Sequence, residues 1–483
     1  MKRYIKSLLA FVAIAVLANS CKGFLDETDQ SKFLPRTADH YSSALLGEFN
    51  YKYAPNSYIQ FMTDDLQDAN TVTQNNSTRE IYQPYFCWQK DVEMNMTSYV
   101  RTDQSSYWAY CYKVIALCNN LLENIDGVSE STVAEINYVK AEAYFIRAFL
   151  YFNLVNLYGE PYENADQAKD ALGVPWKGST GTDTYYNRES LATVYDHILS
   201  DIENSLSHLA ASGLKYDNVY KISEEAVTIF LSRVHLFMKN YDKVITTLDP
   251  IMKKAKLFDY SGIASTQTYE PGNGETIYCY GANTSNNVYS ACTNAYFEAD
   301  WGLFESYQED DQRREKWFTW GVNSDKEITY IRPYKHVYSN MGQCFIRYSE
   351  AYLNRAEAFA FKNSITVAKA DVGTVISNRV LSKMENVTLP DTQDELIKYI
   401  YDERHREFCY EDYYRWFDLR RMGEKYRPEI KRTFKVYNSM AYIRTDTYYL
   451  RKNDPNYTLA LPYKEKENNP MIMDYDRFDK VPE

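Results

Sequence analysis

The chain has 483 residues and a formal net charge of −12 at pH 7. This acidic balance argues against a nucleic-acid-binding protein, because phosphates attract clusters of Lys and Arg. The length is enough to bury a sizeable core in one large or two fused domains. Tyrosine is the compositional outlier with 47 residues, but its amphipathic ring suits sugar stacking and helix packing equally.

Residues 1–20 have the pattern of a signal peptide. An apolar run at 8–18 follows a basic start, and it is too short to span a bilayer. The five residues that end at Cys21 (LANSC) resemble a bacterial lipobox, which predicts lipidation of Cys21 and a lipid-anchored segment at 21–42. An ordinary signal peptide beside an incidental cysteine is the alternative. Acylation with several chains anchors a protein stably, whereas one chain is marginal.

Seven cysteines remain besides Cys21. Their odd number and the lack of CxxC pairs argue against a disulfide framework and against a zinc site. We expect buried free thiols and assign no metal ligand, while metal binding at the acidic stretch 64–68 stays open. These cysteines are Cys87, Cys111, Cys118, Cys279, Cys292, Cys344 and Cys409.

The sequence from residue 104 onward predicts paired helices. Thr132 and Glu135 form a capping box that starts one of them, and an apolar stripe at helical spacing follows to about residue 158. The other helices are predicted at 104–125, 190–209 and 223–239, with a further one after Tyr241.

Two helix pairs look like degenerate tetratricopeptide repeats. In each pair, the small residue of the first helix and the small or branched residue of the second are twelve positions apart. The packing positions are Leu231, Ser232, Tyr241, Val244, Leu248 and Ile251 in one pair, and Tyr352, Ala356, Phe359, Ala368, Val372 and Val375 in the other. Such pairs stack into a scaffold with a concave surface for a partner.

Two stretches, 51–96 and 258–343, break this helical pattern. Both are rich in aromatic and polar residues, and the second contains several glycines and a short strand-like run at 276–280. A further strand is predicted at 442–450. Loops on a rigid scaffold are where ligand binding concentrates, so we expect the ligand face in these two stretches.

The most informative segment is 400–423, IYDERHREFCYEDYYRWFDLRRMG. Helical spacing allows Glu403 to pair with Arg406, or Glu407 with Arg404. Nothing in it is arranged as a nucleophile and its base. From the residues alone we interpret it as a packed helical junction with satisfied ion pairs.

The same segment resembles the C-terminal signature of the SusD/RagB family of Bacteroidetes nutrient-uptake lipoproteins. The pattern is an E-R-x-R-E-x-x-x-E run followed by x-R-W-x-D-L-R-R, and it is met by Glu403, Arg404, Arg406, Glu407, Glu411, Arg415, Trp416, Asp418, Leu419, Arg420 and Arg421. The stretches 345–359 and 141–161 are similar to two further family helices, and 459–470 matches the terminal motif loosely.

The resemblance implies a mostly α-helical fold, a SusD-like scaffold of tetratricopeptide-type helix pairs with long ligand-binding loops and a few short strands. The body would be 43–483, with helix pairs at 104–255 and 344–423. It also implies a cell-surface lipoprotein of the outer membrane that caps a SusC-like TonB-dependent transporter. The helical face would hold the transporter, and the loop face would deliver an oligosaccharide into it.

The expected ligand contacts carry over by region of the chain and not by matched residue. Sugar rings present C–H faces that stack on exposed aromatic rings, and their hydroxyls need polar partners. Core packing is the alternative for any one tryptophan, and Arg313 also belongs to a D-x-R-R run that resembles a structural family motif. The stacking candidates are Trp88, Tyr296, Trp301, Trp317 and Trp320, and the polar ones are Asn294, Arg313 and Asn323.

Two other functions stay open at this point. The RagB branch suggests a peptide- or protein-binding member, which a deep enclosed cleft would favour over an open arc of tryptophans. A glycoside hydrolase would need two carboxylates opposed across a cleft. Motifs for a metalloprotease, an α/β-hydrolase or a P-loop do not occur, so we expect no catalytic residues and no cofactor.

Overall fold

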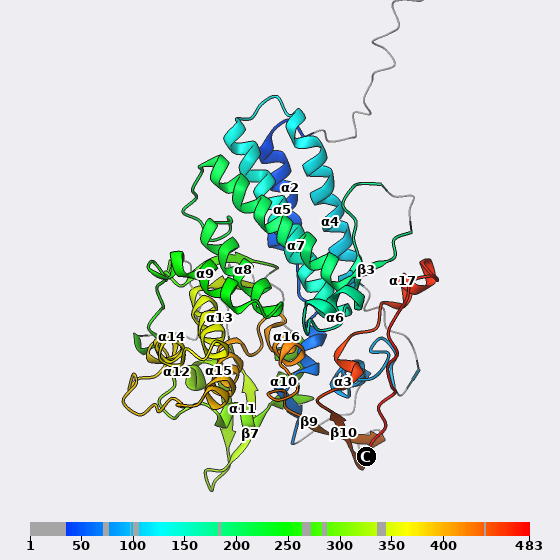
Figure 1. Ribbon diagram of the computed structural model, residues 1–483. Helices are drawn as coiled ribbons and strands as arrows, with labels where there is room; N and C mark the ends of the chain where they lie inside the picture. The colour runs from blue at the N-terminus through cyan, green and yellow to red at the C-terminus, as the bar shows by residue number, and fades with distance from the viewer. Residues whose placement is uncertain are drawn as a thin grey trace, which may run out of the picture.

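A computed structural model shows long helices at one end of the molecule and hairpins and short helices at the other (Figure 1). It describes residues 35–70, 77–96, 98–99, 106–181, 185–262, 272–282, 287–335, 344–438 and 441–483. The predicted signal peptide, Cys21 and most of the predicted anchored segment lie outside these residues. None of the described helices is both long and apolar enough to cross a membrane.

The long helices lie side by side, with α5 at the centre. Thr132 Oγ1 accepts a hydrogen bond from the Glu135 backbone N–H at 3.2 Å, and Glu135 Oε2 accepts one from the Thr132 N–H at 2.8 Å, so the predicted capping box is present. From Tyr138 onward α5 is almost wholly buried, because neighbouring helices surround it. This group contains α2 (Ala38–Lys52), α4 (Ser106–Asn124), α5 (Val133–Tyr158) and α7 (Leu191–Ser212).

The two predicted tetratricopeptide-type pairs are helix hairpins, as expected. The first is α8 (Glu224–Phe237) with α9 (Tyr241–Met252), and the second is α13 (Tyr348–Phe361) with α14 (Ile365–Ser377). Both turn through a residue with left-handed backbone two positions before the second helix, Lys239 at φ +59° and Asn363 at φ +58°.

These two turns also share their backbone hydrogen bonds. The N–H of Asn240 donates to the carbonyl of His235, and in the same way the N–H of Ser364 donates to the carbonyl of Phe359. The two turns lie far apart in the chain but have a left-handed residue at the same position and the same hydrogen bond. The two hairpins therefore repeat one structural unit. A second core cluster at α13, α14 and α15 (Gln393–Phe408) joins the latter pair to α16 (Tyr414–Arg421).

The opposite end is built from two-stranded antiparallel sheets and short helices. Strand β1 (Leu66–Asp68) pairs with β5 (Phe297–Ala299), which joins the two loop-rich stretches predicted to form one face. The strand predicted at 276–280 is β4 (Thr276–Tyr280), and it pairs with β8 (Cys344–Arg347). The other sheets are β2 (Leu172–Pro175) with β3 (Arg188–Ser190), β6 (Phe318–Val322) with β7 (Ile328–Pro333), and β9 (Ile430–Asn438) with β10 (Ala441–Leu450).

Short helices fill the spaces between these sheets. They are α3 (Ser77–Phe86), α6 (Ala165–Asp170), α10 (Asn287–Thr293), α11 (Trp301–Glu305), α12 (Gln312–Trp317) and α17 (Tyr463–Asn468). The single 3-10 turns are η1 (Ser57–Met62), η2 (Ile125–Gly127), η3 (Tyr260–Gly262) and η4 (Pro455–Tyr457).

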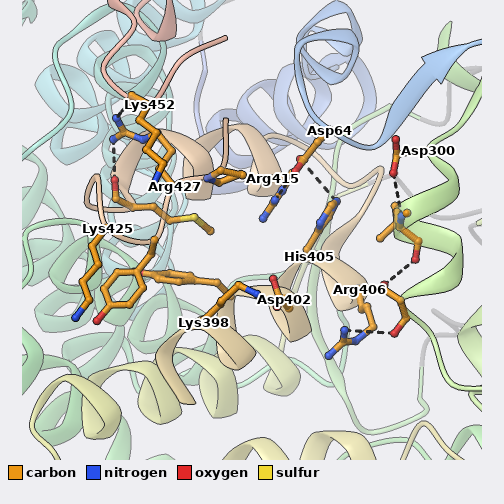
Figure 2. Close-up of a pocket in the computed structure, with 17 residues that line it drawn as sticks. Asp64, Asp300, Lys398, Asp402, His405, Arg406, Arg415, Lys425, Arg427 and Lys452 are labelled. Carbon is orange, nitrogen blue, oxygen red and sulfur yellow. Dashed lines mark hydrogen bonds and ion pairs between the residues drawn. The ribbon is translucent and has the colours of Figure 1, made fainter. Parts of the chain in front are cut away.

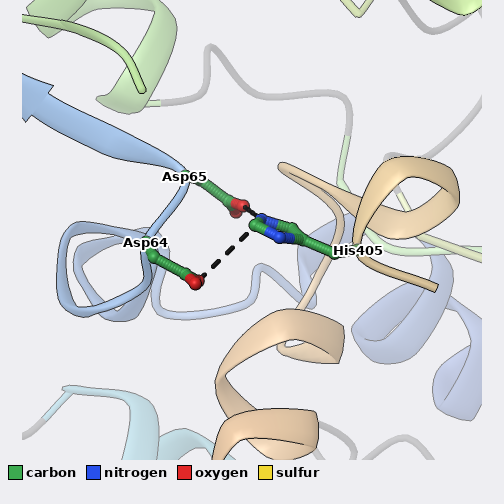
Figure 3. Close-up of side chains that lie close together, drawn as sticks. All are labelled: Asp64, Asp65 and His405. Atoms are coloured by element: carbon green, nitrogen blue, oxygen red, sulfur yellow. Dashed lines mark hydrogen bonds and ion pairs between the residues drawn. The ribbon is translucent and has the colours of Figure 1, made fainter. Parts of the chain in front are cut away.

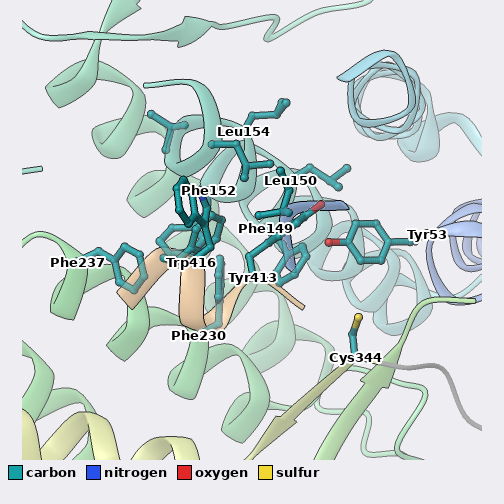
Figure 4. Packing of buried hydrophobic residues seen from close by; sticks show 14 of the residues in the cluster. Tyr53, Phe149, Leu150, Phe152, Leu154, Phe230, Phe237, Cys344, Tyr413 and Trp416 are labelled. Carbon is teal, nitrogen blue, oxygen red and sulfur yellow. The ribbon is translucent and has the colours of Figure 1, made fainter. Parts of the chain in front are cut away.

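The main core is aromatic where the two ends meet (Figure 4). Phe152 of α5 lies edge-to-face with Phe230 of α8 at 5.5 Å between ring centroids, and with Phe417 of α16 at 6.0 Å. Many tyrosines serve the same packing, since Tyr138 donates from its hydroxyl to the Ile222 carbonyl inside the core. The seven described cysteines are buried and free, as predicted.

Candidate functional site

The segment 400–423 forms a buried ion-pair junction at the base of the loop-rich end. Glu407 of α15 is fully buried and accepts from Arg379 at 2.9 Å, from Arg313 at 2.9 Å and from Arg347 at 3.5 Å. Burial disfavours the charged carboxylate, but these three guanidinium groups outweigh it and hold the pKa of Glu407 well below its usual range.

A second part of this junction ties α15 and α16 to α13. Arg404 donates to Asp418 at 2.9 Å, and Arg421 donates to Asp418 at 2.7 Å and to Glu357 at 2.8 Å. Burial acts against ionisation of Asp418, but Arg404 and Arg421 lower its pKa to about 2. The predicted pair between Glu403 and Arg406 is present at 2.8 Å. A pair between Glu407 and Arg404 is not, because Arg404 turns toward Asp418.

The arginines on either side of Asp418 have different tasks. Arg420 meets no carboxylate among the described residues and donates to backbone carbonyls, including those of Asn156 and Gly159 at the C-terminal end of α5. A cation at this end complements the unpaired carbonyls of the helix. Arg415 instead holds both carboxylate oxygens of Asp64 at 2.6 Å and so ties α16 to the loop-rich end.

Three of the predicted ligand contacts are buried, and the prediction for them is wrong. Arg313 is 1% exposed and pairs with Asp311, Glu403 and Glu407. Trp88 is fully buried and donates from its indole N–H to the Met62 carbonyl at 2.8 Å. Trp317 is also fully buried, with the Lys335 ammonium 3.8 Å from its ring centroid. None of these side chains offers a surface to a sugar.

The other five candidates lie at or near the surface. Trp301 and Tyr296 are half-buried, whereas Trp320 is 39% exposed. Asn294 is exposed and caps its own helix turn by donating to the Ser290 carbonyl. Asn323 is exposed too, and its side-chain oxygen accepts the N–H groups of Asp325 and Glu327, so it shapes the β6–β7 turn. These positions remain predictions for ligand contact.

The β6–β7 hairpin carries two exposed rings on opposite faces. Trp320 stands opposite Ile331 and packs on Phe304 of α11 at 5.2 Å between centroids, while Tyr330 stands opposite Gly321. A Cβ at Gly321 would lie 2.3 Å from the Tyr330 ring, so only glycine lets that ring lie across the strand. The Arg332 guanidinium stacks on Tyr330 at 4.5 Å and lines, with Glu298, a hollow of about 210 Å³.

A larger cleft of about 550 Å³ opens between α15, α11 and the segment after α16 (Figure 2). Six basic side chains and three carboxylates line it, together with His405. The sequence analysis did not identify this site. Its signal was the spacing of Lys398, Asp402 and Arg406 four residues apart, which places them on one side of α15. The basic residues are Lys398, Arg406, Arg415, Lys425, Arg427 and Lys452, and the carboxylates are Asp64, Asp300 and Asp402.

Asp64, Asp65 and His405 meet at the edge of this cleft (Figure 3). His405 Nε2 is 2.6 Å from Asp65 Oδ1 and 3.9 Å from Asp64 Oδ1. Burial of Asp64 is outweighed by Arg415 and His405, which hold the pKa of its carboxyl well below the usual range. Because Arg415 occupies both oxygens of Asp64, a metal ion would have to displace this arginine, and the cluster fits an ion-pair network better than a metal centre.

Comparison with known proteins identifies the class. Residues 23–236 match the family model described as starch-binding and associating with the outer membrane, and residues 244–475 match the model of the SusD family. Together these matches span nearly all of the chain. The chain therefore belongs to the SusD/RagB family, as the resemblance in the sequence implied.

Individual relatives are distant. SusD-like protein P25 of Formosa agariphila is 26% identical over 247 residues, which are 49% of this chain and 44% of that protein, so the match spans less than half of the relative's length. Among solved structures, a SusD superfamily protein from Bacteroides thetaiotaomicron aligns with a TM-score of 0.67 at 22% identity, covering 91% of this chain and 100% of its own. Surface glycan-binding protein A from Bacteroides uniformis aligns with a TM-score of 0.63 at 17% identity, over 90% and 98% of the two chains. These structural likenesses establish the fold.

Proposed function

We propose that this protein is a cell-surface, lipid-anchored binding protein that captures an oligosaccharide and delivers it to a SusC-like TonB-dependent transporter without cleaving it. Cys21 is the proposed lipidation site, and the outer membrane is the proposed location. Family membership supports this proposal, and one of the structural relatives is a surface glycan-binding protein.

The observation that carries the proposal is the β6–β7 hairpin, which exposes one large aromatic ring on each of its faces. Trp320 is 39% and Tyr330 38% exposed, on a strand pair held by its own hydrogen bonds. Exposure of a large aromatic ring to water is unfavourable, and a rigid hairpin that presents such a ring is suited to stacking on the C–H face of a sugar. On the face with Trp320, the hairpin packs against α11, the helix that starts at the half-buried Trp301.

A glycoside hydrolase is the second candidate, and one observation favours it. The cleft brings together Asp300, whose pKa burial raises, and Asp64, whose pKa is lowered. Two carboxyl groups whose pKa values are pushed apart are typical of a catalytic pair, in which one acts as general acid and the other as nucleophile or base. However, Asp64 gives both oxygens to Arg415, and Asp300 caps α11 by accepting the Leu303 N–H at 3.0 Å. Both carboxylates thus have structural partners, and binding without cleavage is the function that we propose.

The test is affinity electrophoresis of residues 22–483 in gels that contain soluble neutral and acidic polysaccharides, with Trp320→Ala and Tyr216→Ala beside the parent. Tyr216 is 47% exposed on the loop after α7 and serves as the matched aromatic control. We expect one glycan to retard the parent and the control, and Trp320→Ala to lose about tenfold in affinity, because one well-placed ring often contributes more than about 1.4 kcal/mol.

The polysaccharides recovered from these gels are also analysed for reducing ends. New reducing ends would support the hydrolase and contradict a binding protein. Retardation by no glycan would contradict the glycan proposal, and binding of a peptide library would then support the peptide-binding alternative.

A further inference from the structure

We propose that the 550 Å³ cleft at α15 is a subsite for an anionic group, so that the saccharide bound by this protein carries carboxylates or sulfate esters. This inference rests on the proposed function and names the substrate class of the ligand face. The cleft is separate from the β6–β7 rings but shares a wall with them. Leu303 and Ser306 line the cleft, while Phe304 of the same helix packs on Trp320.

The lining of the cleft has more cations than carboxylates, although the whole protein is acidic. Six cations and three carboxylates line it, in a chain whose net charge is −12. Two of the cations have partners outside the lining, Arg406 with Glu403 at 2.8 Å and Lys425 with Asp394, so the donors that stay available are Lys398, Lys452 and part of Arg415. Because the net charge of the protein is negative, an anion is attracted to this cleft only by its local cations. A concave site with low-dielectric walls focuses such a field.

Several of these positive charges are not used by the protein itself. Lys452 has no acidic partner among the described residues, and Lys398 is 72% exposed with its nearest carboxylate, Asp402, 3.8 Å away. Arg415 donates to Asp64 from Nε and Nη2, so its Nη1 has no acceptor in the part of the chain that the structure describes. A guanidinium group with a vacant nitrogen and two lysines are donors that carboxylate and sulfate oxygens fit.

The backbone that presents these groups is fixed in place. Arg427 is buried and donates to the carbonyls of Leu419 and Met422 at 2.7 Å, and also to the carbonyl of Lys452. It therefore ties the end of α16 to the segment after β10. Arg427 donates to neutral carbonyl groups and not to a carboxylate, so its positive charge is not neutralised. The same contacts hold the backbone of Lys452 beside the cleft.

The acidic side chains lie where the hydroxyls of a sugar would need acceptors. Asp300 stands across the cleft from Lys425, Arg427 and Lys452 (Figure 2). One of its oxygens accepts the Leu303 N–H, and the other has no donor among the described residues. The half-buried ring of Tyr426 also lines the cleft. An acidic sugar has groups that suit each of these side chains. Its anion would face the cations, its hydroxyls would donate to Asp300, and its C–H face would lie on Tyr426. The cleft volume lies in the usual range of ligand pockets.

The experiment compares acidic polysaccharides with their neutralised forms. Alginate and polygalacturonate are used beside their carboxyl-reduced forms, and chondroitin sulfate and heparin beside their desulfated forms, so that carboxylate and sulfate are distinguished. We expect at least one acidic polymer to bind more tightly than its neutralised form. We also expect its affinity to fall as ionic strength rises, because exposed charges are screened.

The variant is Lys398→Gln with Lys452→Gln, and the matched control is Lys253→Gln with Lys254→Gln. Both double variants remove two exposed positive charges. Lys254, like Lys398, is 3.8 Å from its nearest carboxylate, and Lys253 and Lys254 follow α9 on the helical scaffold. We expect the cleft variant to lose about tenfold in affinity for the acidic polymer and the control to lose less than about twofold, since only the cleft lysines lie where the anionic group would bind.

Four results would overturn the inference. Equal binding of acidic and neutralised polymers would show that charge is not recognised. Equal losses in the cleft variant and its control would show that only net charge matters. Binding of neutral polysaccharides alone would refute the anionic subsite and leave the proposed function standing, whereas binding of no polysaccharide would refute both.

Discussion

Helix α15 supplies charged residues to two places with opposite character. On its buried side, Glu403, Arg404 and Glu407 are at most 1% exposed, and each contacts an opposite charge from another element. On its open side, Lys398 and Asp402 are 72% and 51% exposed and stand 3.8 Å apart. The buried charges position the helices, because an unpaired charge there would be costly. The open ones are left available to a ligand.

The largest effect should follow from breaking the buried side at Glu407. Glu407→Gln removes the charge that Arg313, Arg347 and Arg379 share. We expect the free energy of unfolding to fall by about 3–5 kcal/mol, as when one partner of a buried ion pair is lost. Urea denaturation measures this. Glu424→Gln is the control, since Glu424 is exposed and should change stability by less than about 0.5 kcal/mol. A loss at Glu407 as small as that of the control would contradict the structural role of the junction.

A smaller effect, with a pH signature, is expected at Asp412 in the turn between α15 and α16. Burial raises the pKa of this carboxyl to about 6, against the favourable charge of Arg233, and its Oδ1 has no partner among the described residues. The unfolded group titrates near 3.9, roughly two units lower. The native state therefore keeps a proton that the unfolded state has lost. The resulting stabilisation is complete below about pH 4 and is lost as the pH rises through 6.

The test for Asp412 is the difference in unfolding free energy between Asp412→Asn and the parent, followed from pH 4 to pH 8. We expect the variant to gain up to about 3 kcal/mol over the parent across this range, since one pKa unit corresponds to about 1.4 kcal/mol. Asparagine tolerates the positive φ of +39° and can still accept the hydroxyl of Tyr280. A pH-independent difference would show that Asp412 is already ionised near its ordinary pKa.

The smallest effect should come from the open side. Lys398→Gln with Lys452→Gln is expected to change the unfolding free energy by less than about 0.5 kcal/mol, because both side chains are exposed and neither has a close ion pair. The same urea titration as for Glu407 gives the comparison directly. A loss of several kcal/mol in this double variant would mean that the cleft lysines belong to the scaffold after all.

The fold was predictable where local chemistry decides it. Thr132 with Glu135, the small residues of the two helix hairpins and the strand at 276–280 all carry their signal within a few positions, and the structure confirms them. For the junction, the sequence predicted buried ion pairs but not most of the partners. The contact of Arg313 with Glu407 joins residues 94 positions apart, and no local spacing distinguishes it from the Arg404 pairing that was expected.

The candidate site was less predictable, because exposure is a property of the folded chain. Trp317 and Trp320 are three residues apart in one loop-rich stretch, yet one is fully buried and the other is 39% exposed. Trp317 is the last residue of α12 and faces the core, whereas Trp320 lies on β6, where the strand has left the core. Composition marked the stretch that contains both rings, but only the strand register distinguishes the buried ring from the exposed one.

The β1–β5 ladder has a consequence for how such proteins can be recombined. Leu66, Gln67 and Asp68 pair with Ala299, Glu298 and Phe297, and the Gln67 amide also donates to the Glu298 carboxylate at 2.7 Å. A chimera that takes 51–96 from a relative and keeps 258–343 would pair β5 with a strand of different sequence. The side-chain contact between Gln67 and Glu298 would then be lost. If these two segments form the proposed ligand face, a transfer of ligand preference has to move both together, although their paired residues are 231 positions apart in the chain.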